Sequence, residues 1–114
     1  MARNPRLALD EIIEEIDWLG AMISGRSLSD FSADRALRYA VERAIEIISE
    51  ASRRIPAELK SVRPEIDWRG VGDIGNFLRH EYHSTAVKII WDVVQTDLAQ
   101  LRSAVEGIRD SLKP

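Results

Sequence analysis

The apolar residues near the end of the chain constrain its fold most, because they follow one helical stripe over the length of a long helix. Their steps are three, four, four, three, four, three and four residues. This spacing places side chains on one face of an α-helix, in a near-heptad seam. The stripe comprises Val87, Ile90, Val94, Leu98, Leu101, Val105, Ile108 and Leu112. No segment shows the sustained alternation of a half-buried strand, so the sequence predicts an all-α fold.

Two earlier segments also have helical periodicity. The first runs from about Pro5 to Ser24, where proline suits the first helical turn and Gly25 suits a C-terminal stop. The second is expected to start at capping oxygens of Ser29 and Asp30 and to end before Pro56. Both segments carry an apolar stripe, which predicts that each buries one face.

A third helix is predicted over about Trp68 to Tyr82, with Asp67 as its N-cap. Gly70, Gly72 and Gly75 weaken this helix by about 1 kcal/mol each relative to alanine. The glycines are consistent with two arrangements. Either another backbone or a ligand packs closely against them, or the first turn of the helix is loose.

The connection between the second and third helices is short and irregular. Pro56 and Pro64 bracket it, and one helical turn fits between them at Ala57 to Lys60. Four helices joined by short connections predict an antiparallel four-helix bundle. The chain of 114 residues is expected to be a single domain, residues 1–114, with a core of its own.

Composition excludes several classes of function. There are no cysteines, which excludes disulfides, thiolate metal sites and cysteine nucleophiles. The net charge of −3 argues against broad, charge-driven adhesion to nucleic acid, although a small cleft acting on RNA is compatible with it. The chain has neither a signal-peptide core nor an apolar run near the roughly 20 residues that span a membrane. We expect a cytoplasmic protein without a membrane partner.

Both histidines lie in one island, Arg79-His80-Glu81-Tyr82-His83. Histidine is the side chain most easily poised for proton transfer near neutral pH. RNA cleavage without a metal needs a base for the 2′-hydroxyl and a cation or donor for the crowded phosphorane. An imidazole and a guanidinium can supply these two roles, so His80 and Arg79 form a candidate catalytic pair.

The island also allows a purely structural role and a metal-binding role. A histidine near a helix C-terminus interacts favourably with the helix macrodipole and needs no further function. A zinc site built on His80 and His83 would need a third protein ligand, for which only Glu81 or a distant carboxylate such as Glu50 is present. We therefore expect no metal.

An ordered series of motifs covers nearly the whole chain. They are Asp34-Arg35-Ala36-Leu37-Arg38-Tyr39-Ala40-Val41-Glu42-Arg43, Ile47-Ile48-Ser49-Glu50-Ala51, Pro64-Glu65-Ile66-Asp67-Trp68, Asn76-Phe77-Leu78-Arg79-His80-Glu81-Tyr82, Ile90-Trp91-Asp92-Val93-Val94 and Asp97-Leu98. With these motifs the chain resembles the HepT-like toxins of the HEPN superfamily. The resemblance implies a HEPN-type helical bundle and a ribonuclease activity.

The resemblance also identifies site residues. Such families carry an arginine, four intervening residues, a histidine, any residue and a tyrosine; His80 and Tyr82 match, but Gly75 occupies the arginine position. Arg79 is the nearest candidate replacement, and His83 is a candidate auxiliary acid-base group.

Arginines outside the island could also supply the missing cation. Arg43 and Arg38 of the second helix are candidate donors, as is an arginine of a partner subunit. Arg43 is therefore included with the candidate site as an auxiliary residue.

Partners also follow from the resemblance. It implies a homodimer with a shared cleft, an RNA substrate, no cofactor, and an MntA-like minimal nucleotidyltransferase antitoxin that transfers AMP to Tyr82. Phosphate charge and bulk beside His80 would then block the cleft. Because Gly75 breaks the motif, the alternative is a catalytically impaired module that binds nucleotide, RNA or the nucleotidyltransferase without cleavage. A purely structural dimeric adaptor is a third class.

Overall fold

The computed structural model describes residues 4–80 and 83–112, and within these ranges every regular element is a helix. The all-α prediction is confirmed. The elements in chain order are α1 (Pro5–Ile23), α2 (Leu28–Ala33), α3 (Arg35–Arg53), α4 (Ala57–Lys60), α5 (Trp68–Arg79), α6 (His83–Asp92), the π-helix η1 (Val93–Asp97) and α7 (Leu98–Ser111). No helix of the described residues is long and apolar enough to cross a membrane.

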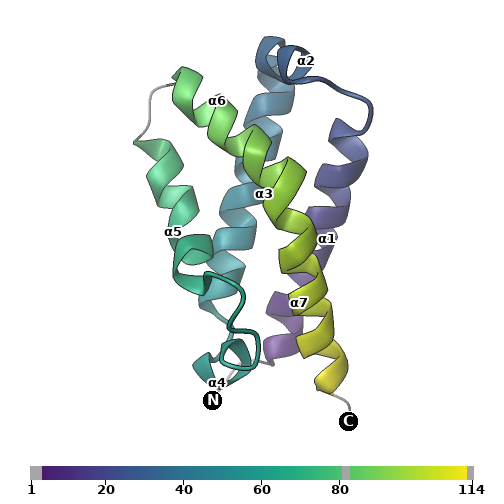
Figure 1. Ribbon diagram of the computed structural model, residues 1–114, viewed down its shortest axis with the longest axis vertical. Helices are drawn as coiled ribbons and strands as arrows, with labels where there is room; N and C mark the ends of the chain where they lie inside the picture. The colour runs from purple at the N-terminus through teal and green to yellow at the C-terminus, as the bar shows by residue number, and fades with distance from the viewer. Residues whose placement is uncertain (1–3, 81–82, 113–114) are drawn as a thin grey trace.

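The helix α3 lies at the centre of the molecule. It packs against α1 on one side and α5 on another, while α1 also packs against α7. The short helix α2 covers the end of the molecule near α3 and α6, and α4 lies at the opposite end (Figure 1). The core comes from apolar stripes of α1, α3, α6 and α7, with 0% exposure at Leu9, Leu19, Val41, Ile90 and Val105.

The prediction of one helix from Ser29 and Asp30 to Pro56 was wrong. Two helices occupy this stretch, and Ser27 rather than Ser29 caps the first, with Asp30 completing a reciprocal capping box. Asp34 then takes an extended conformation, φ −101° and ψ 96°, and its side chain accepts the backbone N–H of Leu37. An N-cap residue must leave the helical conformation, so Asp34 ends α2 and starts α3.

The apolar stripe of the last helix is confirmed, but its helix is longer and less regular than predicted. It begins at His83, and the turn at Val93–Asp97 is a π-helix in which the N–H of Leu98 bonds to the carbonyl of Val93. The stripe takes two successive steps of four residues here, at Val94 and Leu98. Steps of four exceed the 3.6 residues of an α-helical turn, so a wider turn keeps both residues near the core.

The glycines of α5 allow a close approach to α3. A Cβ at Gly75 would lie 3.5 Å from both the Cα of Glu46 and the Cβ of Ser49, and one at Gly72 would lie 3.2 Å from Cγ of Arg53. At Gly72 the glycine therefore serves close packing, whereas the space at Gly75 would accept a Cβ at ordinary van der Waals distance. The predicted end of this helix at Tyr82 lies outside the described residues; the described helix ends at Arg79, with His80 as its C-cap.

Candidate functional site

The N-terminal half of α5 is held in register with α3 by polar contacts around Gly72. The carbonyl of Gly72 accepts hydrogen bonds from Ser49 Oγ at 2.8 Å and from Arg53 Nη1 at 2.6 Å. Ser49 is buried, and its bond is sheltered from water. Two side chains of α3 therefore fix one turn of α5, and this determines where the following residues of α5 lie.

A small polar hollow lies between the two helices. It has a volume of about 70 Å³, and its walls combine charged residues of α3 with Gly75, Asn76 and Arg79 of α5. From α3 come Arg43, Glu46, Ser49, Glu50 and Arg53. Because both cationic and anionic groups border it, the hollow is suited to a small charged group whose contacts are directional.

The charges around Arg43 are partly balanced. Its guanidinium lies 3.2 Å from the carboxylate of Glu46, and its side chain is 68% exposed. The charge of Arg43 also acts on Glu15 of α1. Burial and the neighbouring Glu14 and Glu11 raise the pKa of Glu15, while Arg43 opposes this shift. An exposed ion pair of this kind contributes little to stability, so Arg43 is available for another anion.

The structure brings together part of the predicted site. Arg79 and Arg43, from different helices, border the same hollow. His80 follows Arg79 directly at the end of α5 and is exposed, although it does not line the hollow. Tyr82 lies outside the described residues. His83 is the first residue of α6, and its backbone alone is described.

The structure separates the two alternative arginines of α3. Arg38 is only 9% exposed, and its Nη1 donates to the carbonyl of Ser32 beneath α2. Arg38 thus binds α2 and does not line the hollow, whereas Arg43 does. Of these two candidates, Arg43 is the one positioned with Arg79.

The sequence analysis missed several residues that line the hollow, among them the charged Glu46 and Arg53. Glu46 and Arg53 share the face of α3 that carries Arg43 and Glu50, since positions 43, 46, 50 and 53 are spaced by three, four and three residues. That spacing is a usable signal. The spacing indicates a site only when the helix that packs against this face of α3 is known.

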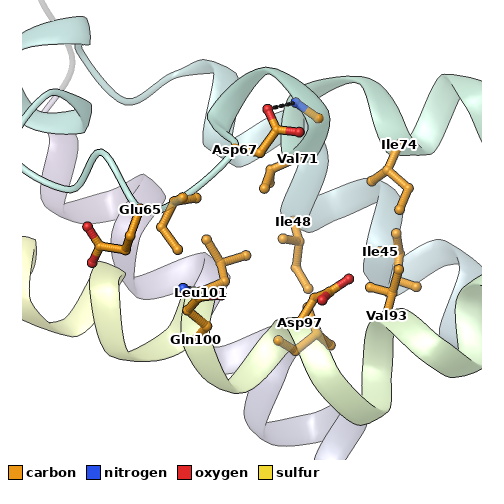
Figure 2. A pocket seen from close by; sticks show the side chains of 13 residues that line it. Ile45, Ile48, Glu65, Asp67, Val71, Ile74, Val93, Asp97, Gln100 and Leu101 are labelled. Carbon is orange, nitrogen blue, oxygen red and sulfur yellow. Dashed lines mark hydrogen bonds between the residues drawn. The ribbon is translucent and has the colours of Figure 1, made fainter.

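A second and larger cavity is apolar. It has a volume of about 360 Å³ and lies between α5 on one side and η1 and α7 on the other, over Ile45 and Ile48 of α3 (Figure 2). The carboxylates of Glu65, Asp67 and Asp97 lie at its border. Asp67 already caps α5 through the N–H of Gly70 at 3.0 Å. This cavity has no acid-base group apart from these carboxylates, so it suits binding better than catalysis.

Among the side chains that the structure describes, which exclude that of His83, no three histidine, aspartate or glutamate groups are arranged to hold a metal ion. The candidate site is thus built from two arginines, an exposed histidine and nearby carboxylates. Such groups can bind a phosphate and move a proton.

Comparison with known proteins gives consistent matches along the chain. Residues 12–108 match the model of a family described as "Ribonuclease HepT-like". A protein of Thermococcus cleftensis named as a probable ribonuclease HepT is 34% identical over 109 residues, which are 96% of this chain and 99% of the relative. A protein of Caldanaerobacter subterraneus subsp. tengcongensis named as a candidate RNase is 30% identical over 106 residues, 93% of this chain and 95% of the relative. No solved structure matches the chain.

Proposed function

Because this chain belongs to the HepT-like ribonuclease family, we propose that it is a metal-independent ribonuclease and the toxin of a toxin–antitoxin pair. Its substrate is RNA, cut at a cleft shared by two copies of an antiparallel, HEPN-type four-helix bundle. Its site of action is the cytoplasm. The match covers residues 12–108, which include the whole of the candidate site.

One observation carries the proposal. Arg79 and His80 are adjacent and exposed at the end of α5, where Arg79 borders a polar hollow that also contains Arg43. A phosphate held by these guanidinium groups would bring the neighbouring ribose close to His80. This combination of an anion site and an imidazole is what acid-base cleavage of RNA requires.

The proposed reaction is an internal transfer of the phosphoryl group. His80 takes the proton of the ribose 2′-hydroxyl, and the 2′-oxygen forms a bond to phosphorus as the bond to the 5′-oxygen breaks. The products are a 2′,3′-cyclic phosphate and a 5′-hydroxyl, and the proton goes to the leaving oxygen. Arg79 stabilises the negative charge on the phosphorane, and His83 is a candidate second acid-base group.

Expression of the wild-type chain tests this proposal directly. We expect growth arrest and fragmented RNA on induction, and we expect the purified protein to cleave RNA with chelator present. Cyclic phosphate and 5′-hydroxyl ends on the fragments would match the proposed chemistry. Intact RNA and normal growth, with folded protein in the cell, would contradict it.

The antitoxin proposal makes a separate prediction about Tyr82. A minimal nucleotidyltransferase would transfer AMP from ATP to its hydroxyl and release pyrophosphate. The modification adds a negative phosphate beside His80 and repels the substrate phosphate. Tyr82→Phe removes the hydroxyl nucleophile, so we expect the variant to stay toxic when the nucleotidyltransferase is co-expressed. Mass spectrometry should find one added AMP on the wild type and none on the variant. AMP on Tyr82→Phe would exclude Tyr82 as the sole acceptor.

Gly75 favours a second candidate function, a binding module without turnover. The family motif has an arginine at this position, and here α5 packs its glycine directly against Glu46 and Ser49 of α3. Gly75→Arg distinguishes the two functions. A large gain of RNA cleavage over the wild type would favour an impaired parent. An unchanged rate in a wild type that does cleave RNA would show that another group already supplies the cation.

A further inference from the structure

We propose that the hollow beside Gly75 is the phosphate subsite, and that Arg43 supplies from α3 the guanidinium that position 75 lacks. This inference rests on the proposed ribonuclease function, which it deepens by assigning the substrate contact. It concerns the hollow bordered by Arg43, Glu46, Gly75, Asn76 and Arg79.

The position that lacks the motif arginine, Gly75, borders the hollow. Gly75 forms part of the wall, and a Cβ there would point at Glu46 and Ser49 of α3, at ordinary van der Waals distances of 3.5 Å. An arginine at position 75 would therefore start at the α3–α5 contact, at the border of the hollow. Because position 75 is glycine, the hollow of about 70 Å³ is open to a small group such as a phosphate.

Three arginines border this space, but they are not equivalent. Arg53 donates to the Gly72 carbonyl at 2.6 Å and so is occupied in holding α5. Arg43 makes an exposed ion pair with Glu46, and Arg79 lies on the opposite helix. A phosphate between Arg43 and Arg79 would meet guanidinium groups from two directions, which resembles the forked contact that arginine makes with phosphate oxygens.

The carboxylate of Glu46 makes this inference testable, because loss of its charge and loss of the Arg43 charge should change RNA affinity in opposite directions. Glu46 lies 3.2 Å from the Arg43 guanidinium and also borders the hollow, so it competes with an incoming phosphate for the same donor. Removal of the Glu46 charge should strengthen RNA binding, while removal of the Arg43 charge should weaken it. If Arg43 served only to hold α3, both changes would break the same ion pair and would act in the same direction.

Binding of a non-cleavable RNA tests the inference independently of catalysis. The probe is a short, fluorescent 2′-O-methyl RNA, which lacks the attacking hydroxyl, and its anisotropy is measured with the full chain. We expect Arg43→Gln to weaken binding about 10- to 100-fold and to reduce the salt dependence by about one counterion. We expect Glu46→Gln to strengthen binding about two- to fivefold.

Arg35→Gln is the matched control. Arg35 is an exposed arginine of the same helix, contacts Tyr39 and does not border the hollow. Its loss removes the same charge but should leave the affinity almost unchanged. Equal losses for Arg35→Gln and Arg43→Gln, no loss for Arg43→Gln, or no binding by the wild type would each overturn the inference.

A second-site change completes the test. In the Arg43→Gln background, Gly75→Arg should restore most of the lost affinity, because it returns a guanidinium to the same hollow from the other helix. Failure of this rescue in a folded double variant would count against a shared phosphate subsite.

The failures of the inference and of the proposed function are distinguishable. Arg43-dependent binding without cleavage would refute the ribonuclease and leave the subsite intact. Cleavage that depends on His80 but not on Arg43 would do the opposite.

Discussion

Replacement of His80 by alanine is expected to abolish growth arrest and to lower RNA cleavage by about 100- to 10,000-fold. This is the range that a positioned acid-base group contributes to a proton transfer. His80 is exposed at the C-cap of α5, and the bonds that end this helix come from its backbone N–H to the carbonyls of Phe77 and Leu78. Alanine keeps that N–H, so the fold should not change.

The measurement is the initial rate of cleavage by purified protein, with growth and total RNA followed in parallel. The wild type and the variant should have the same melting temperature and elution volume, which separates a lost proton transfer from a lost fold. Binding of the 2′-O-methyl RNA should change far less than cleavage does. Cleavage by His80→Ala at the wild-type rate would remove His80 from the mechanism.

Replacement of Phe31 by alanine is expected to have the largest effect on stability, a loss of about 3–5 kcal/mol. Phe31 is 1% exposed and is the only residue of α2 that is buried. Its ring packs on Trp91 of α6, with 5.6 Å between the ring centroids. Alanine would leave a cavity and remove the single apolar anchor that holds α2 against α3 and α6.

Thermal unfolding, followed by the loss of helical circular dichroism, checks this prediction. A loss of this size should lower the melting temperature by more than about 10 °C. Leu28→Ala is the control, since Leu28 belongs to the same helix but is 38% exposed. Similar losses for the two variants would show that α2 is not anchored through Phe31.

Local patterns predicted most of the helices correctly. The apolar stripes indicated where α1, α3 and the last helix lie, because each helix buries one face and the period of 3.6 residues is visible in the chain. The Asp67 N-cap indicated where α5 begins. The boundary at Asp34 was not predicted, although Asp34 is a good N-cap residue, because Ser29 and Asp30 a few residues earlier also offer capping oxygens. The π-helix at Val93–Asp97 was not predicted either, although the two successive four-residue steps of the stripe coincide with it.

The candidate site was predictable only in part. Arg79 and His80 are neighbours in the sequence, and the chemistry of their side chains pointed to phosphate binding and proton transfer. The hollow beside them requires residues from α3 that lie more than one helix away in the chain, so no local pattern contains it. The role of the α5 glycines likewise depended on the approach of α3 to Gly72 and Gly75.

The sequence by itself determined that this chain is helical, which face of each helix is apolar, and that the motif arginine position holds Gly75. Only the tertiary structure decided which arginine faces that glycine. Arg38 and Arg43 lie on one helix, yet α2 covers Arg38 while Arg43 borders the hollow with Arg79. The physical reason is that periodicity places a side chain on a face of its own helix, whereas burial depends on which other helix packs there.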